Sequence, residues 1–225
     1  MLNTIKSYAK INLFLNVVDK LDTGFHELNS VLSRIDLYDE IRIKDESSFS
    51  ISYNGPFGDQ VGSNDHVSKL FNYLIDKNYL KQKSFAIHVV KNIPVGSGLG
   101  GGSSNVAEII KYLIRSNLLD NSSSTEIARD LGSDIEFFID EGSALISGKG
   151  NVDQRLKINS DKHFLIVFPN VQNSTKDIFN KHSNLSGEKF SYNKDTNLDG
   201  ILKGTSNELE KTALLANQEM KKIRE

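Results

Sequence analysis

Residues 94–107 read PVGSGLGGGSSNVA, and five of the residues from 96 to 102 are glycine. Behind them, apolar residues recur with the spacing of one helix face, at Val106, Ala107, Ile110, Leu113 and Ile114. The expected N-cap of this helix is Ser103 or Ser104. Glycine lets the backbone approach a ligand closely, and a helix N-terminus directs free N–H groups at one point. We therefore expect residues 94–102, the glycine loop, to bind an anion, namely a nucleotide phosphate.

Three other interpretations of the glycine loop compete with this one. A flexible linker is usually followed by polar sequence rather than by a helical pattern. A Walker loop needs Lys after the last glycine, where this chain has Ser103. Gly96, Gly98 and Gly101 satisfy the dinucleotide-binding spacing, but that fold needs a strand ending in an acid after the helix. Here the helix is followed by Leu118-Leu119-Asp120 and a run of Asn and Ser, which is the wrong context.

Composition limits the classes of function. The chain has 225 residues and a formal net charge of −2, with 25% charged and 38% hydrophobic residues. These values are ordinary for a globular protein and give no reason to expect nucleic acid or an anionic membrane as a partner. The chain has no Cys, which excludes disulfides and thiolate chemistry. Its start is too polar for a signal peptide and no apolar run approaches a membrane span, so a cytoplasmic location is expected.

Strand and helix patterns alternate along the chain and place it in the α+β class. Residues 5–18 are rich in β-formers but break their pattern at 9–12, so a strand is expected through 13–15, with Lys10 and Asn12 at its start. Further strands are expected at residues 31–38, 40–43, 49–53, 85–90 and 143–146. Helices are expected at 65–78, from the glycine loop to about 116, and at 125–130, with turns at 132–134 and 148–150. Beyond a boundary near Asn159, FLIVF (164–168) is expected to be a strand buried on both faces, with helices at 175–181 and 207–224. The sequence thus predicts two domains, 1–158 and 159–225.

Taken singly, the polar residues that stand out have ordinary explanations. Lys10 and Asn12 are two positions apart and share one face of the first strand, but such a lysine is more often a solvated edge residue. An aromatic–His pair after a turn, here Phe25-His26, more often packs than binds a ligand. Asp134 follows a glycine turn, where an acid usually serves as a cap.

Five motifs that occur in order along the chain favour a functional role for these residues. PVGSGLGGGSS resembles the phosphate loop of the GHMP small-molecule kinases. SYAKINLFL, followed by GFHEL, resembles the signature of the 4-diphosphocytidyl-2-C-methyl-D-erythritol kinase family within that group. LGSDIEFF, SALISGKG and FPNVQNSTKDIF resemble three further blocks of the same family, and the match runs from about Tyr8 to Glu210. Five ordered motifs are far more specific than any one of them.

The resemblance implies a two-domain GHMP kinase fold. Its N-terminal domain would be like domain 2 of ribosomal protein S5, and its C-terminal domain would be an incomplete ferredoxin-like one. The implied activity is ATP-dependent phosphorylation of the 2-hydroxyl of the cytidylyl-methylerythritol substrate, in the non-mevalonate route to isoprenoids. Mg²⁺ accompanies ATP in the family, and no residue of this chain is assigned to it. The implied partner is a small molecule, with no nucleic acid or membrane, and the oligomeric state is left open.

The family's site residues carry over onto matching positions. Lys10 and Asp134 become the catalytic pair, in which Asp134 accepts or orients the hydroxyl proton and Lys10 stabilises the incipient alkoxide. The implied nucleotide contacts are Pro94, Gly96, Gly98, Leu99, Gly100, Gly101, Gly102, Ser103 and Ser104. Lys91 and Asn64 are implied to line the adenine pocket.

On the substrate side, the resemblance implies that the cytosine is recognised by His26 and two aromatic rings. These rings are Phe25, where the family commonly has Tyr, and Phe179. Each ring stacked on a base contributes about 1–3 kcal/mol. Asn12 and Thr175 match polar positions near the substrate.

One family motif has no counterpart in this sequence. The family carries a second glycine-rich stretch of the S-G-S-G type after an N-D-L-E segment, which Asn207–Glu210 resembles. Its absence predicts an unpaired sheet edge in the second domain. Three functions therefore stay open: an active kinase of this family, a truncated and weak or inactive remnant that binds nucleotide, and a GHMP kinase for another alcohol. Phe25, His26 and Phe179 argue against the third.

Overall fold

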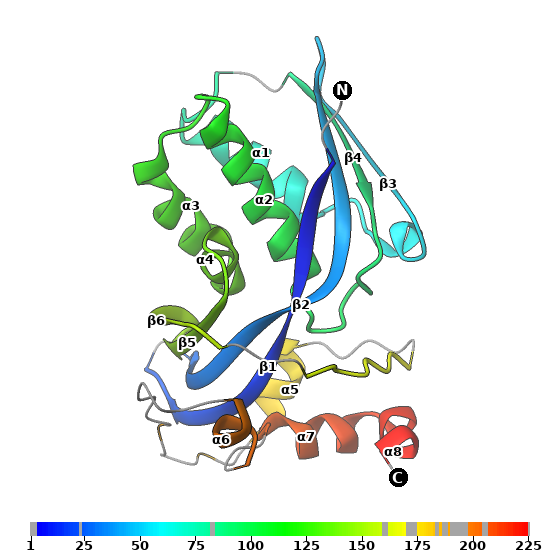
Figure 1. Cartoon of the computed structure of the whole chain (residues 1–225), viewed down its shortest axis with the longest axis vertical. Coiled ribbons are helices and arrows are strands. Elements are labelled where there is room, and N and C mark those ends of the chain that lie inside the picture. Colours follow the sequence, from blue (N-terminus) through cyan, green and yellow to red (C-terminus); the bar gives the residue numbers. More distant parts are fainter. Residues whose placement is uncertain are drawn as a thin grey trace. The chain divides into compact units, whose positions relative to one another are not determined.

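The structure is a computed structural model that describes residues 4–22, 24–81, 84–158, 162–169, 175–182, 185, 189, 198–203 and 207–224. Figure 1 labels its helices and strands. The strands are β1 (Ile5–Lys20), β2 (His26–Asp45), β3 (Ser50–Asn54), β4 (Phe85–Val90), β5 (Ser143–Gly148) and β6 (Asn151–Leu156). The helices are α1 (His66–Asp76), α2 (Gly101–Arg115), α3 (Ser124–Leu131), α4 (Ser133–Ile139), α5 (Thr175–Lys181), α6 (Leu198–Lys203), α7 (Leu209–Ala216) and α8 (Gln218–Arg224), with short 3₁₀ turns at Gly58–Gln60 and Asn121–Ser123.

Contacts within the chain divide it into two compact units. Unit 1 comprises Met1–Lys10, Ile35–Val95 and Leu99–Glu141, and unit 2 comprises Ile11–Arg34, Gly96–Gly98 and Gly142–Glu225. This division differs from the single boundary expected near residue 159. The reason is that β1 and β2, of 16 and 20 residues, each continue from one unit into the other. No one position in the sequence separates the units.

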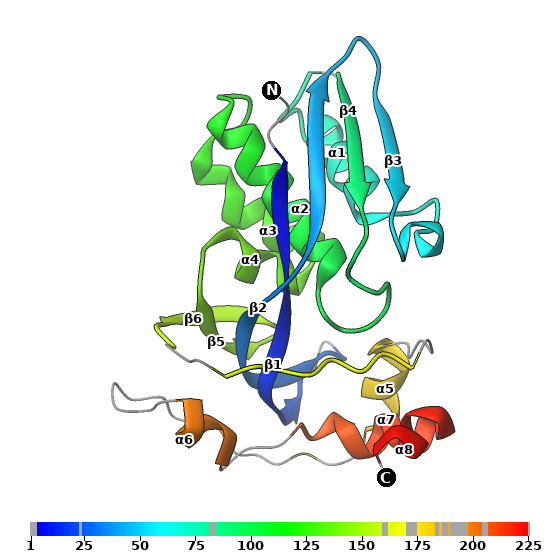
Figure 2. The same ribbon diagram turned by 45° about the vertical axis from the view of Figure 1, so that its right-hand side comes forward.

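Unit 1 is a sheet with helices on one face. Helices α1 to α4 lie on the same side of β3, β4 and the C-terminal half of β2 (Figures 1 and 2). β3 and β4 are parallel, and β4 is antiparallel to β2, with Ile43 opposite Ile87. Alternate β4 residues, Phe85, Ile87 and Val89, are buried, as in any strand with one face against a core. The helices bury apolar stripes against this face, such as Leu70, Phe71 and Leu74 of α1.

The first turn of α1 is fixed by a buried acid. The Asp65 carboxylate accepts bonds from the backbone N–H groups of Val67 and Ser68, both at 2.9 Å, and from the hydroxyls of Tyr53 and Ser68. Burial raises the pKa of this carboxyl, but the bonds outweigh it, so its pKa lies below the ordinary value. A depressed folded-state pKa means that the stabilisation is present above the ordinary pKa and is lost as pH falls through the folded one.

We therefore expect Asp65→Ala to lower the free energy of unfolding by about 1–2 kcal/mol at neutral pH, the usual size of a lost N-cap. The deficit should shrink as pH falls below about 4, because the Asp65 carboxyl of the unfolded chain then binds a proton, and it should vanish below the depressed pKa of the folded state. Urea unfolding at both pH values measures this. Asp59→Ala, at an exposed acid, is the control, and equal pH dependence in the two variants would contradict the assignment.

Unit 2 combines a hairpin with short helices. β5 and β6 are antiparallel around the turn at 148–150; the strand before this turn and the turn itself were predicted, whereas β6 was not. β5 also pairs with the N-terminal half of β2. The core of this unit contains Leu13, Phe14, Val31 and Leu156, together with Leu198 and Ile201 of α6. A parallel bridge joins Leu15 to Asn207, and the Glu208 N–H donates to the Leu15 carbonyl at 2.9 Å.

Three expectations about elements are wrong. Residues 164–168 form no strand, and Phe164, Leu165, Ile166 and Val167 are exposed, because no strand of the described ranges pairs with them. The helix expected at 207–224 is broken at Asn217, where φ is −143° and ψ is 109°. The Asn217 side chain then accepts from the Glu219 N–H at 3.0 Å, a cap that competes with continuing the helix. The strands expected at 31–38 and 40–43 are one strand, β2.

Candidate active site

The glycine loop joins β4 to α2. Gly96, Gly98 and Gly100 have φ of 73°, 76° and 73°, in the left-handed region that favours glycine. Gly100 is the N-cap of α2 and no side chain caps this end, so the expectation that Ser103 or Ser104 would be the cap is wrong. The helix includes two residues before the serines, Gly101 and Gly102, because the glycine backbone adopts the required turn without a side-chain cap. The first N–H groups of α2 have no acceptor within the helix, which suits an anion.

Lys10 and Asp134, far apart in the sequence, lie together in unit 1. Lys10 is on β1 and Asp134 is in the first turn of α4, and Lys10 Nζ is 3.4 Å from Asp134 Oδ2. The Lys10 side chain is 8% exposed and that of Asp134 is 36% exposed, so the carboxylate is accessible and the ammonium is held behind it. The backbone N–H of Lys10 also donates to the Leu99 carbonyl at 2.9 Å, which ties β1 to the glycine loop.

Gly100 is the point at which the loop touches this pair. A Cβ on Gly100 would lie 2.9 Å from the ring of Phe138 on α4 and 3.1 Å from Cγ of Lys10. Both distances are shorter than ordinary contacts between carbon atoms. The absence of a side chain at residue 100 therefore lets the loop, β1 and α4 approach one another, and the N-terminus of α2 begins directly beside the Lys10–Asp134 pair.

Lys91, which is expected to line the adenine pocket, is bonded through its ammonium to groups of unit 1. Its side chain is 4% exposed and forms an ion pair with Asp39, which is fully buried, and its Nζ is 3.2 Å from Oδ1 of Asn105. Burial lowers the pKa of the Lys91 ammonium, and the charge of Asp39 opposes that shift. These protein groups enclose the Lys91 ammonium, and the place of Lys91 at a nucleotide pocket stays a prediction. Asp39 and Asn105 were not predicted, although an acid inside the apolar strand pattern around residue 39 was a possible signal.

The other expected nucleotide contacts differ in accessibility. Pro94, Leu99, Gly101 and Ser104 are buried, whereas Gly102 and Ser103 are half-buried and Asn64 is exposed. A Cβ on Gly102 would lie 2.8 Å from Nδ1 of His66, the first residue of α1. The starts of α1 and α2 therefore meet at this contact. His66 was not singled out from the sequence, and no local pattern marks it.

The expected substrate residues of unit 2 are only partly together. The His26 ring stacks on Phe179, with ring centroids 5.3 Å apart and an interplanar angle of 27°. Burial lowers the pKa of His26, and the charges of Lys20 and His182 act in the same direction. Phe25 is 61% exposed, and its ring faces Lys149 Nζ at 4.9 Å.

The two expected polar substrate contacts differ in what the structure shows of them. Asn12 Nδ2 donates to the Ser30 hydroxyl at 2.8 Å, so this side chain is anchored within unit 2. The side chain of Thr175 lies outside the described residues.

Comparison with known proteins shows which family the chain belongs to. The family profile described as "GHMP kinases N terminal domain" matches residues 65–145, a range that contains the glycine loop and Asp134. A 4-diphosphocytidyl-2-C-methyl-D-erythritol kinase of Pelagibacter ubique (strain HTCC1062) is 35% identical over 225 residues, which covers 98% of this chain and 79% of the relative. The chain belongs to this kinase family. Kinases of the same name from Prochlorococcus marinus (strain MIT 9301) and Sulfurihydrogenibium sp. (strain YO3AOP1) are 38% and 33% identical, and the chain spans 59% and 63% of their lengths.

Solved structures agree on the fold. A crystal structure of 4-(cytidine 5'-diphospho)-2C-methyl-D-erythritol kinase superposes with a TM-score of 0.75 at 24% identity, covering 99% of this chain and 81% of that one. The mevalonate kinase of Methanococcus jannaschii gives a TM-score of 0.56 at 16% identity, covering 100% and 80%. The expected α+β GHMP kinase fold is confirmed.

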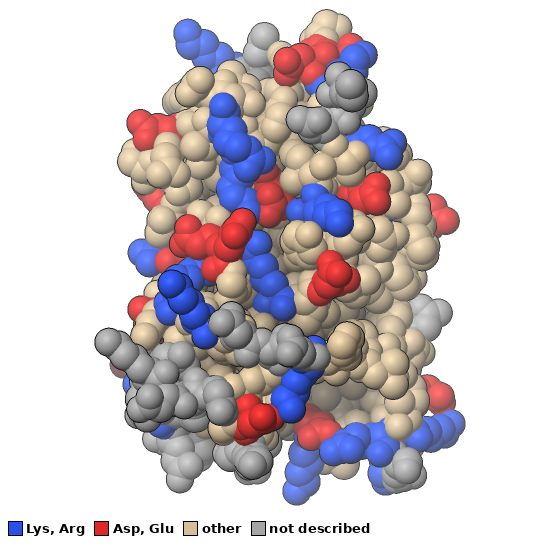
Figure 3. Space-filling model, in the orientation of Figure 1, with Lys and Arg blue, Asp and Glu red and all other residues tan. Residues whose placement is uncertain are grey.

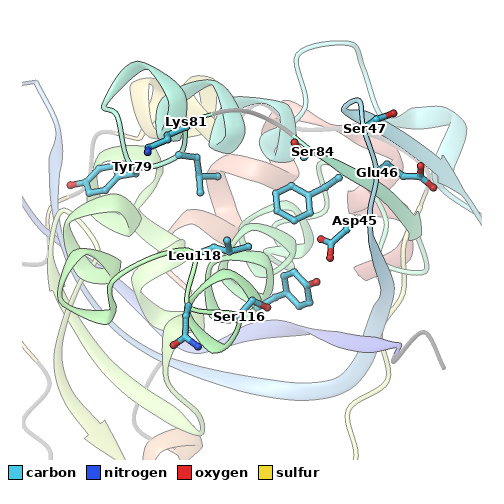
Figure 4. A pocket seen from close by; sticks show the side chains of 12 residues that line it. Asp45, Glu46, Ser47, Tyr79, Lys81, Ser84, Ser116 and Leu118 are labelled. Carbon is cyan, nitrogen blue, oxygen red and sulfur yellow. The ribbon is translucent and has the colours of Figure 1, made fainter.

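Unit 1 contains a hollow of about 940 Å³ near the end of α2 that lies away from the glycine loop. Figure 4 shows its lining at the end of α2, with Ser116 and Leu118 on one side and, on the other, Asp45 at the end of β2 and Glu46 just after it. Tyr112, the first α2 residue that lines the hollow, is 11 residues beyond Gly101, and at a rise of about 1.5 Å per residue that is about 16 Å. The hollow is therefore not where the Lys10–Asp134 pair acts.

Charge and metal-ligand patterns are compatible with a small-molecule kinase. On the face in Figure 3, Lys and Arg side chains are interspersed with Asp and Glu. Among the described residues, no helix is both long enough and apolar enough to cross a membrane. Nor do three His, Asp or Glu side chains of those residues gather where they would hold a metal ion.

Proposed function

We propose that the chain transfers the γ-phosphoryl group of ATP to the 2-hydroxyl of 4-diphosphocytidyl-2-C-methyl-D-erythritol. The observation that carries this proposal is the Lys10–Asp134 pair, with Nζ and Oδ2 3.4 Å apart, beside the start of a helix preceded by a glycine loop. The 35% identity to the Pelagibacter kinase over 98% of the chain supports the choice of substrate. Phosphoryl transfer needs positioning and charge stabilisation rather than a covalent intermediate, and these groups supply both.

In this mechanism the glycine loop and the first turn of α2 hold the nucleotide phosphates. The N–H groups at the helix start donate to phosphate oxygens, and the positive end of the helix dipole favours their charge. Gly98 has no Cβ and nothing lies within 4 Å of the position that a Cβ would take, so the backbone there can approach the phosphates closely. The serines at 103 and 104 lie inside the first turn, and Ser104 Oγ accepts a bond from the Ser7 hydroxyl at 2.8 Å.

Asp134 and Lys10 act on the accepting alcohol. The substrate oxygen attacks the γ-phosphorus, the bond from that phosphorus to the bridging oxygen of ADP breaks, and the hydroxyl proton passes to the Asp134 carboxylate. The Lys10 ammonium stabilises negative charge on the attacking oxygen and holds Asp134 in place. The partial exposure of Asp134 leaves its carboxylate open to the alcohol, while the buried Lys10 is fixed by its position on β1.

The assay for this proposal follows ADP release from ATP and Mg²⁺ in the presence of the cytidylyl substrate. Mass spectrometry should detect a gain of one phosphoryl group, and cytidine nucleotides should compete. Turnover of another alcohol without inhibition by cytidine nucleotides would assign a different GHMP activity. Calorimetric binding of nucleotide without ADP release would contradict catalysis and indicate a binding protein.

Phe179 gives a prediction for the substrate side. Loss of one base-stacking ring removes about 1–3 kcal/mol, so Phe179→Ala should raise the KM for the cytidylyl substrate by roughly 5- to 150-fold. The KM for ATP should stay unchanged. Phe164→Ala, at an exposed ring of the same unit, is the matched control. Steady-state kinetics with each substrate varied in turn measure both values, and an equal rise in the two KM values would count against a stacking role.

A further inference from the structure

We propose that Asp39 is the positioning residue that holds both ends of the glycine loop in place for the nucleotide. Its kinetic consequence rests on the function proposed above. Asp39 lies on β2 and is fully buried. Its carboxylate bonds to Lys91, Asn92, Ile93 and Asn105 rather than to Lys10. Its four bonds all go to groups that flank the loop, on its two sides.

One carboxylate oxygen fixes the residues before the loop. Asp39 Oδ1 accepts the backbone N–H of Asn92 at 2.8 Å and that of Ile93 at 2.9 Å, immediately ahead of Pro94. The Asn92 side chain adds a 3.0 Å bond to the Tyr38 carbonyl, next to Asp39. The chain that enters the glycine loop is therefore bonded to β2 over two consecutive residues.

The other oxygen fixes the helix after the loop. Asp39 Oδ2 accepts from Asn105 Nδ2 at 3.0 Å and from the Lys91 ammonium. Asn105 lies in α2, and its Nδ2 also donates to the Ser7 hydroxyl at 2.9 Å. Ser7 is three residues before Lys10 on β1, so the same network connects the helix start to the strand that carries the catalytic lysine.

Asparagine cannot replace this carboxylate. An ionised Asp accepts bonds at both oxygens, whereas the amide of Asn has one acceptor oxygen and an NH₂ group that only donates. In Asp39→Asn, either the two backbone N–H groups or the Lys91 and Asn105 donors would face another donor. One end of the glycine loop would lose its anchor in either orientation.

Charge adds a second reason for Asp39. A Cβ on Gly101 would lie 3.2 Å from Lys91 Nζ, so the buried ammonium sits against the first residue of α2. A positive charge at a helix N-terminus is unfavourable, and Asp39 neutralises it. In Asp39→Asn the ammonium would be unpaired and would act against the helix start. Asp39→Asn/Lys91→Met removes that charge but leaves the loop without its carboxylate anchor.

The experiment compares Asp39→Asn, Asp39→Asn/Lys91→Met and Leu113→Ala. Leu113 is a fully buried residue near the other end of α2, so its truncation reduces stability without touching the network. Both Asp39 variants should raise the KM for ATP by roughly 10- to 100-fold, the range found when supporting groups behind a site are removed. They should leave the KM for the cytidylyl substrate unchanged. Backbone amides of residues 94–105 should exchange with solvent about tenfold faster than in the wild type.

The outcomes separate the alternatives. Unchanged exchange at 94–105 in both Asp39 variants would overturn the proposal, as would an equal rise in the KM for ATP in Leu113→Ala. If Asp39→Asn does not fold, the double variant, which lacks the unpaired ammonium, provides the same comparison. If the wild-type chain shows no turnover, the proposed kinase function fails, while amide exchange and ADP affinity by calorimetry still decide the role of Asp39.

Discussion

Replacement of Asp134 by asparagine is expected to lower kcat by about 10²–10⁴, the usual contribution of a general base. The amide is close in shape to the carboxylate but does not take up the hydroxyl proton, and it no longer pairs with the Lys10 ammonium 3.4 Å away. The KM for ATP should change little, because the groups proposed to hold the phosphates lie in the glycine loop. Single-turnover measurements with saturating ATP separate this effect on chemistry from any effect on product release.

The control for this variant is Glu141→Gln. Glu141 is an exposed acid shortly after α4, so the same change from acid to amide is made nearby but away from Lys10. Glu141→Gln should keep the wild-type kcat. If Asp134→Asn also keeps it, Asp134 is not a proton acceptor and its bond to Lys10 has only a structural role.

The second large effect is expected for Gly100→Ala. A non-glycine residue at the positive φ of 73° is strained by about 1–3 kcal/mol. The new Cβ would also overlap the Phe138 ring and Lys10 Cγ, at 2.9 and 3.1 Å. Relief of that overlap would displace Lys10, and a displacement of about 1 Å at a reacting group lowers the rate about 10²-fold. We therefore expect kcat/KM to fall by at least about 10²-fold, with a lower melting temperature.

Two alanine variants separate the causes. Gly98→Ala has the same backbone problem, with φ of 76°, but its Cβ would meet nothing within 4 Å. Gly62→Ala has an open site and no positive φ. If displacement of Lys10 is the main cause, Gly100→Ala should lose much more activity than Gly98→Ala at a similar melting temperature. Equal losses in the two would show that backbone strain in the loop is sufficient.

Helices and strands with a regular apolar pattern were predicted correctly from local sequence. Apolar spacing identified α1, and the alternation of Phe85, Ile87 and Val89 identified β4. Glycine density predicted the loop between β4 and α2, although not the residue at which α2 begins. The Lys10–Asp134 pair was different, because no local pattern joins two residues so far apart. Only the ordered family motifs predicted it, and the structure brings the two side chains together.

Properties set by distant contacts were not predictable from local sequence. The FLIVF segment has the composition of a buried strand, but strand formation depends on a neighbour, and none of the described strands pairs with it. Lys91 matched a nucleotide-binding position of the family. The hydrogen bonds of its ammonium go to Asp39 and Asn105, which lie far from each other in the sequence and so give no local signal. The break at Asn217 depends on one side-chain bond that apolar spacing does not report.

The course of β1 and β2 through both units limits how this protein can be dissected. A fragment ending at residue 158 would keep Leu13, Phe14 and Val31 but lose Leu198 and Ile201, with which they share a core. A fragment beginning at 159 would have no part of either long strand. Expressing either fragment alone for ligand screening would therefore expose apolar side chains. Libraries of variants are better built on all 225 residues.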